Sequence, residues 1–259
     1  MSHLNGKTAL VTGGGSGIGE AIAIDLADAG VAVTICGRRA EPLEETARKI
    51  TDNGGNANCI VTDMTDPDDI EKLAHNLLDQ GGPDIIVNNA GFSSKVRSPL
   101  FIGADEWRSV MDVNTMGPAI LNRHLLDSMI TKGEGDIVLI ASMAALRPSV
   151  LGGVAYSAAK IAAKAYMEVL EQEIKRYGIR CLTVCPGEVD TPVLINRPLP
   201  PGKDERALML LPEDVSAAVM MALSLPRRAT IKEIAITPTV PRDRTADIAA
   251  AQAKQFPES

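Results

Sequence analysis

Apolar residues occur along the chain in short continuous runs. Segments of mixed polarity lie between these runs. The runs occupy residues 7–12, 31–36, 57–62, 84–87, 137–140, 179–184 and 231–236, and each is predicted to be a strand. Predicted helices lie between them, one from the glycine-rich stretch 13–19 to about residue 29 and others at 41–52, 68–79, 104–130, 154–177 and 212–223. Continuous apolar runs are typical of strands buried on both faces. The pattern therefore predicts an α/β fold, a doubly wound parallel sheet of about seven strands with helices on both faces.

Breaks in this pattern are few. Gly117 and Pro118 interrupt a predicted helix and indicate a local distortion there. Residues 186–211 are rich in proline and are predicted to be irregular. Because no linker or internal repeat divides the chain, we expect a single domain over 1–259. Its polar, alanine-rich end at 242–259 is a frayed helix, an oligomer contact or a flexible tail.

Composition narrows the class of protein. Of the 259 residues, 45% are hydrophobic but only 3% are aromatic, so the predicted core is aliphatic. The net charge is -7 and no basic stripe is present, which argues against nucleic acid as a partner. No apolar run reaches the roughly 18 residues of a membrane span, and the first residues lack the pattern of a signal peptide. The four cysteines show no close metal-ligand spacing, so we expect reduced thiols in a cytoplasmic protein without a metal.

Candidate chemistry is densest between Ile137 and Lys164. Tyr156 and Lys160 lie four residues apart in a predicted helix, and therefore on one face. A neighbouring ammonium favours the phenolate, so we expect Lys160 to lower the pKa of Tyr156 toward neutrality, where it serves as a general acid/base. Ser142 follows a predicted buried strand and offers a hydroxyl to a carbonyl oxygen. Taken alone, this spacing is common by chance and favours a helix with one buried tyrosine and one solvated lysine; the rest of the chain changes that weighting.

A glycine-rich turn joins the first predicted strand to the first predicted helix. Glycines allow the backbone to approach a pyrophosphate, and the N-terminus of the following helix offers free N–H groups and a positive dipole. The alternative is a merely tight turn, but the position in the first βα unit favours a dinucleotide. The candidate cofactor residues of this turn are Gly13, Gly15, Ser16, Gly17, Ile18 and Gly19.

Taken together, six short motifs resemble the short-chain dehydrogenase/reductase family in its compact form of about 250 residues. They occur in the order and at the spacings of that family, from residue 7 to about residue 237. The motifs are Thr12-Gly13-x-x-x-Gly17-x-Gly19, Asn88-Asn89-Ala90-Gly91, Asn114, Ser142, Tyr156-x-x-x-Lys160 and Pro186-Gly187-x-Val189-x-Thr191. The resemblance implies a Rossmann-type fold and an oxidoreductase that exchanges a hydride with a small carbonyl or secondary-alcohol substrate.

The resemblance also implies roles for four catalytic residues. Tyr156 would donate a proton to the carbonyl oxygen, and Ser142 would orient and polarise the carbonyl. Lys160 would lower the pKa of Tyr156 and hold the hydroxyls of the nicotinamide ribose. Asn114 would hold a water that links Lys160 to solvent. From the residues alone, Asn114 is equally a side chain that caps a helix kink near Gly117.

Further positions of the same motifs are expected to contact the cofactor. They are Asn89, Ala90 and Gly91 after the fourth strand, Met64 after the third, and Pro186, Gly187, Val189 and Thr191 after the sixth. Asp63 would meet the adenine, although the sequence Asp-x-x-Asp-Pro is also a helix-start signal.

Charge at the end of the second strand bears on the choice of cofactor. NAD-binding folds place an acidic residue there to bind the 2′-hydroxyl of the ribose. This chain has Arg38 and Arg39 instead, and arginine binds a 2′-phosphate bidentately. We therefore expect NADP(H) rather than NAD, with Arg38 as the main contact; two solvated arginines at a turn are the alternative.

The substrate side is less determined. By resemblance, the pocket is lined by Phe92, Ser93, Met143, Arg147, Val150, Leu151, Glu188, Val193, Leu194 and Ile195. Arg147 and Glu188 would bind polar substrate groups or pair with each other. The short 191–211 segment argues against a large lid. Family members form dimers or tetramers through the helices at about 104–131 and 154–177, so we expect a homo-oligomer.

Two other functions were weighed against this one. A catalytically silent NADP(H)-binding sensor or scaffold is disfavoured, because all four expected catalytic residues are present. An epimerase or dehydratase would need a separate substrate domain, for which the chain has no residues.

Overall fold

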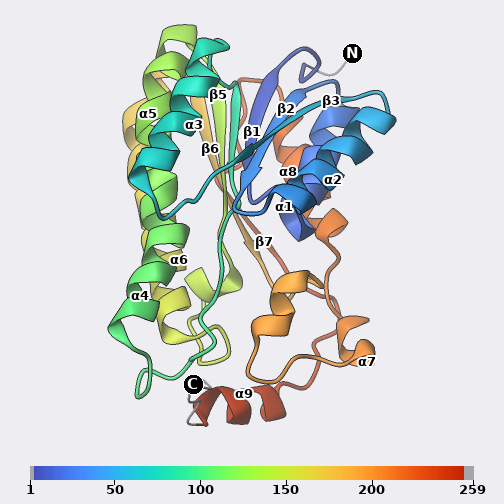
Figure 1. The fold of residues 1–259 in the computed structure, drawn as a ribbon, viewed down its shortest axis with the longest axis vertical. Helices are drawn as coiled ribbons and strands as arrows, with labels where there is room; N and C mark the ends of the chain where they lie inside the picture. The colour runs from blue at the N-terminus through green and yellow to red at the C-terminus, as the bar shows by residue number, and fades with distance from the viewer. Residues whose placement is uncertain (1–2, 254–259) are drawn as a thin grey trace.

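A computed structural model describes residues 3–253 of the chain (Figure 1). Seven parallel strands form one sheet in the order β3-β2-β1-β4-β5-β6-β7. This is the predicted Rossmann-type fold. The strands are β1 (Thr8–Thr12), β2 (Ala32–Gly37), β3 (Asn56–Val61), β4 (Ile85–Asn88), β5 (Gly135–Ile140), β6 (Ile179–Pro186) and β7 (Glu233–Ile236).

Helices cover both faces of the sheet (Figure 1). One face carries α1 (Gly17–Asp28), α2 (Ala40–Asp52) and α8 (Pro212–Leu223). The other carries α3 (Pro67–Asp79), α5 (Gly117–Lys132) and α6 (Val154–Ile174), with α4 (Ala104–Met111) beyond them. Two aliphatic clusters of buried side chains hold these layers together, one on each face. The aliphatic core expected from the low aromatic content is confirmed.

The predicted 104–130 helical region is interrupted where Gly117 and Pro118 indicated a distortion. A π-helical turn, Asp112–Met116, lies between α4 and α5. Its wider backbone spacing turns the Asn114 side chain into the buried interior, where its exposed fraction is 0%. The distortion thus serves to place one polar side chain next to the sheet.

The carboxyl ends of all seven strands lie at one edge of the sheet, because every pairing is parallel. The chain order reverses between β1 and β4, which is where doubly wound folds form a ligand crevice. The irregular 186–211 segment supplies a 3₁₀ turn (Pro192–Asn196) and α7 (Lys203–Arg206) at this same edge (Figure 1). No helix within residues 3–253 combines the length and apolar character needed to cross a membrane.

The end of the chain forms a helix in the described residues. Residues Thr245–Gln252 form α9, which lies across the carboxyl edge of the sheet (Figure 1). Its Asp247 is 4% exposed. Of the three alternatives for 242–259, the structure shows a helix at Thr245–Gln252; an oligomer contact stays a prediction, and residues 254–259 lie outside the described part.

Candidate active site

A cavity of about 1300 Å³ opens at the carboxyl edge of the sheet. Nearly every predicted catalytic or cofactor residue lines it. These residues are Gly13, Gly15, Ser16, Gly17, Ile18, Arg38, Arg39, Asp63, Met64, Asn89, Ala90, Gly91, Ser142, Tyr156, Lys160, Pro186, Gly187, Val189 and Thr191. The two exceptions, Gly19 and Asn114, lie directly behind the lining.

The glycine-rich turn forms one wall. Gly13 and Gly17 have φ of 67° and 57°, in the left-handed region that favours glycine. A Cβ on Gly19 would come within 2.3 Å of the Gly13 carbonyl oxygen, so only glycine allows α1 to pack this closely on the turn. Ser16 precedes α1 without a capping hydrogen bond from its side chain. The N-terminal amides of α1 are therefore available to an anion.

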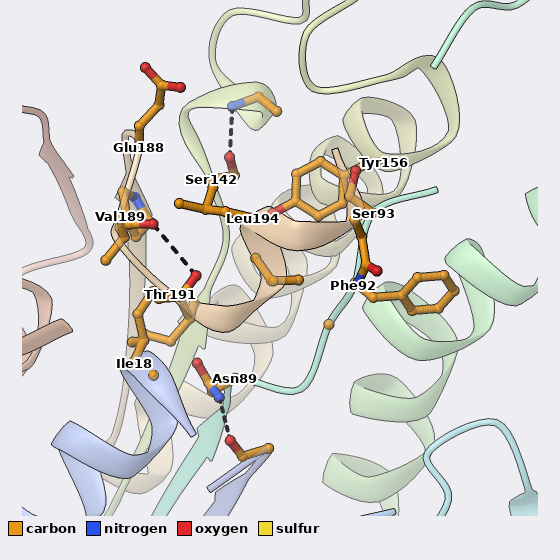
Figure 2. A pocket seen from close by; sticks show the side chains of 18 of the residues that line it. Ile18, Asn89, Phe92, Ser93, Ser142, Tyr156, Glu188, Val189, Thr191 and Leu194 are labelled. Atoms are coloured by element: carbon orange, nitrogen blue, oxygen red, sulfur yellow. Dashed lines mark hydrogen bonds between the residues drawn. The ribbon is translucent and has the colours of Figure 1, made fainter. Parts of the chain in front are cut away.

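The Asn88–Gly91 segment braces this turn against β4. The Asn89 side chain donates to the carbonyl oxygens of Thr12 at 2.9 Å and Gly13 at 3.2 Å (Figure 2). The Thr12 hydroxyl accepts hydrogen bonds from the Asn89 and Ala90 amides at 3.0 and 2.9 Å. The carboxyl ends of β1 and β4 are thus tied together at the point where the sheet order reverses.

Ser142, Tyr156 and Lys160 meet at the other wall. Ser142 follows β5, and its hydroxyl accepts a hydrogen bond from the Ala144 amide at 3.1 Å (Figure 2). Tyr156 and Lys160 lie one turn apart on α6, and the Lys160 ammonium stands 5.6 Å from the centroid of the Tyr156 ring. The ammonium also donates to the Ile140 carbonyl at the end of β5, at 2.9 Å. Strand β5 and helix α6 therefore bring the three predicted side chains together.

The expected lowering of the Tyr156 pKa is wrong for the chain by itself. Burial raises the pKa of Tyr156, and a hydrogen bond with Ser142 and the positive charges of Arg97 and Arg197 only partly oppose this. Burial also lowers the pKa of Lys160 to about 8. The four-residue spacing correctly predicted that Tyr156 and Lys160 lie close together. It could not show that burial raises the pKa of Tyr156 more than nearby positive charges lower it.

Asn114 braces the distorted helix, which is one of the two roles considered for it, and the water relay stays a prediction. Its amide nitrogen donates to the Val110 carbonyl at 2.8 Å, within the distorted helix, and to the Phe92 carbonyl at 2.9 Å. Its amide oxygen is buried and lacks a hydrogen-bond partner. A Cβ on Gly91 would lie 2.5 Å from that oxygen and 3.2 Å from the Lys160 ammonium. An unsatisfied acceptor therefore lies beside Lys160, separated from the cavity only by a glycine.

The far end of the cavity carries Arg38 and Arg39. Both side chains are exposed, and no carboxylate of residues 3–253 lies within ion-pair distance of either. Arg39 also precedes α2. The helix-start signal near Asp63 belongs to Asp66, whose side chain accepts from the Asp68 amide at 2.9 Å. Asp63 accepts from the Thr65 amide at 2.9 Å and remains on the cavity wall.

Most residues expected on the substrate side also line the cavity. They are Phe92, Ser93, Met143, Arg147, Leu151, Glu188, Val193, Leu194 and Ile195; Val150 does not. Glu188 does not pair with Arg147. Instead it accepts from Arg197 at 2.6 Å and from Arg242 at 2.8 Å.

Sequence reasoning missed four arginines at this end: Arg97, Arg197, Arg242 and Arg244. Arg97 lies six positions past Gly91, in a stretch that pointed to the pocket, so a search there for charged residues would have found it. Arg197 and Arg242 carry no sequence signal, because both pair with Glu188 across irregular segments, at separations of 9 and 54 residues that no local pattern predicts. Arg242 binds both Glu188 and Asp247 and thereby joins α9 to the cavity wall.

Comparisons with known proteins agree with this geometry. A sequence model of the family described as short chain dehydrogenase matches residues 7–199. An uncharacterized oxidoreductase of Staphylococcus aureus (strain USA300) is 33% identical over 242 residues, which cover 92% of this chain and 100% of that protein. A metagenomic short-chain oxidoreductase solved with NADP has 28% identity and a TM-score of 0.80, covering 92% of this chain and 99% of that one. An alcohol dehydrogenase of the archaeon Thermococcus sibiricus, solved with 5-hydroxy-NADP, has 27% identity and a TM-score of 0.82, covering 92% and 98%.

Proposed function

Because this chain belongs to the short-chain dehydrogenase family and is an oxidoreductase, we propose that it interconverts a small carbonyl compound and its secondary alcohol with NADP(H). The observation that carries the proposal is the meeting of Ser142, Tyr156 and Lys160 on a cavity that the glycine-rich turn also lines. Proton donors at one wall and an anion-binding helix terminus at the other suit a reaction between a dinucleotide and a carbonyl.

In reduction, Tyr156 donates its phenolic proton to the carbonyl oxygen. Ser142 donates a hydrogen bond to the same oxygen and orients it: its hydroxyl accepts from the Ala144 amide, and its proton turns from Tyr156 to the substrate oxygen. When bound, the cofactor supplies the hydride that reaches the carbonyl carbon. In oxidation, Tyr156 returns to the phenolic form by accepting the proton of the alcohol.

Lys160 and Asn114 restore the proton on Tyr156. With a pKa of about 8, the Lys160 ammonium gives up and regains a proton near neutral pH. The free acceptor of Asn114 beside it suits a water that continues the path toward solvent. The Lys160 ammonium has further N–H donors for ribose hydroxyls besides the one that binds the Ile140 carbonyl.

The residues present fit NADP(H). The uncapped N-terminus of α1 suits the pyrophosphate, and Arg38 and Arg39 suit a 2′-phosphate because no carboxylate of residues 3–253 neutralises them. The neighbours solved with NADP and 5-hydroxy-NADP support the same choice. A dissociation constant for NADH equal to or lower than that for NADPH would contradict it.

The test is the oxidation of NADPH, followed by absorbance, with a panel of small aldehydes, ketones, diketones and keto acids. Tyr156→Phe should lower kcat/KM by about 10²- to 10⁴-fold, the contribution typical of a positioned general acid. Tyr166→Phe is the matched control, because Tyr166 lies on the same helix but outside the cavity lining. Equal turnover by Tyr156→Phe would remove this residue from its role. Tight NADPH binding without turnover of any panel member would favour the silent binding protein.

A further inference from the structure

One charged side chain at the substrate end of the cavity lacks a counter-ion. Arg97 lies in the loop between β4 and α4 and lines the cavity, although its exposed fraction is only 4%. Its guanidinium donates to the Gly152 carbonyl at 2.7 Å and contacts the Ser93 hydroxyl. Its Nε is buried and has no hydrogen-bond partner. Among residues 3–253, no carboxylate forms an ion pair with it.

Glu106, the acid that acts on Arg97 electrostatically, does not fill this gap. Glu106 attracts Arg97 from a distance, but its carboxylate contacts the Ser94 hydroxyl. Burial lowers the pKa of Arg97 to about 10, so its guanidinium still carries a full charge at neutral pH. Buried charges are costly unless an opposite charge or a full set of hydrogen bonds compensates them. The pocket therefore holds a cation whose electrostatic partner the described chain does not supply.

The surroundings strengthen this imbalance. Among the described residues, Glu188 is the single carboxylate that lines the substrate end of the cavity, while Asp247 and Glu205 reach Arg242 from outside the lining. Five arginines line this end: Arg97, Arg147, Arg197, Arg242 and Arg244. Glu188 is held by Arg197 and Arg242, so it cannot also serve Arg97. The positive charge of Arg97 also acts on Tyr156, whose pKa it lowers. An unneutralised cation thus lies within electrostatic reach of the proposed proton donor.

We propose that Arg97 binds a carboxylate of the substrate, so that the enzyme acts on small oxo-acids and the matching hydroxy-acids rather than on neutral ketones. The assignment rests on the proposed carbonyl–alcohol chemistry and adds to it the substrate class. The substrate carboxylate accepts charge-assisted hydrogen bonds from the guanidinium and supplies the missing negative charge. Its carbonyl is thereby held toward Ser142 and Tyr156.

Arg97 also has a structural role, which the test must separate from substrate binding. Arg97 packs against the turn before α6. It donates to the Gly152 carbonyl, and a Cβ built on Gly153 would lie 2.8 Å from the Arg97 Cδ. A purely structural loss, or a loss of influence on Tyr156, would lower turnover of charged and neutral substrates alike. A carboxylate site instead changes the ratio between them.

The first measurement is kcat/KM for matched acids and methyl esters with NADPH. The acids are pyruvate, acetoacetate, 4-oxopentanoate and 5-oxohexanoate, which place the carboxylate at increasing distances from the carbonyl. The wild type should prefer the best acid over its ester by about 10- to 100-fold, the usual contribution of hydrogen bonds between charged groups. Arg97→Met should bring this ratio close to one, and Arg97→Lys should restore part of it. Arg108→Met, an exposed arginine on α4, is the matched control and should keep the ratio.

A second measurement does not depend on turnover. Calorimetry compares the binding of butanoate and butanamide to the protein saturated with NADP⁺. Neither compound contains a ketone, so neither is a substrate for reduction. Butanoate should bind at least about tenfold more tightly to the wild type, and Arg97→Met should remove the difference. Thermal unfolding of each variant shows whether it is folded. If Arg97→Met is not, Arg97→Gln replaces it, because glutamine also lacks the positive charge.

The outcomes separate this inference from the proposed function. Three results would overturn the inference while leaving the oxidoreductase chemistry intact. The wild type could show an acid-to-ester ratio near one. The preference for the acid could survive Arg97→Met, or Arg147→Met could remove it instead. An equal loss for acid and ester in Arg97→Met would also overturn it. Butanoate binding that needs Arg97, without reduction of any carbonyl, would keep the anion site and reject the proposed reaction. If the protein neither binds butanoate nor turns over any carbonyl compound, both the inference and the proposed function are rejected.

Discussion

Arg242 should decide whether α9 stays attached to the cavity. Its side chain is 4% exposed, and its guanidinium donates to Glu188 at 3.1 and 2.8 Å and to Asp247 at 2.9 and 2.8 Å. Asp247 belongs to α9, whereas Glu188 follows β6 on the cavity wall. Arg242→Met keeps most of the side-chain volume and removes the charge that joins these two carboxylates.

The expected cost follows from which partners remain. Removing one member of a buried ion pair destabilises by about 3–5 kcal/mol, because a charge is left buried without a partner. Glu188 retains Arg197 at 2.6 Å, but Asp247 retains only a longer contact to Arg197 at 3.8 Å. We therefore expect about 2–4 kcal/mol, most of it from Asp247. This loss falls on the attachment of α9 rather than on the sheet.

Amide hydrogen exchange measures that attachment directly. At about 1.4 kcal/mol per tenfold, exchange of the α9 amides should accelerate by about 30- to 1,000-fold in Arg242→Met. The amides of β1, β4 and β5 should keep their protection, because none of these strands contacts Arg242 by a hydrogen bond or ion pair among the described residues. Arg244→Met is the matched control, since Arg244 is an exposed neighbour in the chain.

The pH dependence adds a sign that can be checked. Burial alone would raise the pKa of Glu188 and Asp247, but hydrogen bonds from Arg242, with Arg197 contributing, hold the pKa of both below the ordinary range. Lowered carboxyl pKa values stabilise the protein above the unfolded-state pKa of about 4, and this stability is lost as pH falls below it. The difference between wild type and Arg242→Met should therefore be full at neutral pH and shrink in acid. Unchanged α9 exchange in Arg242→Met, or a difference that grows in acid, would refute the reasoning.

Three further predictions concern the cavity. Arg38→Ala should raise the dissociation constant of NADPH by about tenfold or more and leave that of NADH nearly unchanged. Fluorescence titration measures both constants, and an equal effect on the two would reject a contact between Arg38 and the 2′-phosphate. Lys160→Met should be more stable than wild type in urea at neutral pH, and the gap should close as pH rises above about 8, because the buried wild-type ammonium with its lowered pKa then loses its charge. A constant gap would contradict that pKa. Gly19→Ala should abolish NADPH binding, since its Cβ would lie 2.3 Å from the Gly13 oxygen, whereas Gly54→Ala, at an exposed turn with open space around it, should not.

The sequence by itself determined the layers of this protein and most of its candidate site. Continuous apolar runs predicted the seven strands, and periodic segments predicted the helices, because burial on two faces or on one leaves a local pattern. Five strands are buried as expected, but the edge strands β3 and β7 are partly exposed, because each has a neighbour on one side only. The glycine-rich turn, Ser142, Tyr156 and Lys160 were found for a related reason. Each follows a strand or shares a helix face, and parallel strands bring such positions to one edge.

Only the tertiary structure decided how these groups affect one another. The direction of the Tyr156 pKa depends on burial, which spacing along a helix does not contain. The uncompensated charge of Arg97 depends on which carboxylates lie nearby, and the attachment of α9 depends on Arg242 and Glu188, which are 54 residues apart. Electrostatic energies sum over neighbours in space, whereas local patterns register only neighbours in the chain. The lining of this end of the cavity was largely predicted, whereas the ion pairs and the unpaired charge within it could be found only in the tertiary structure.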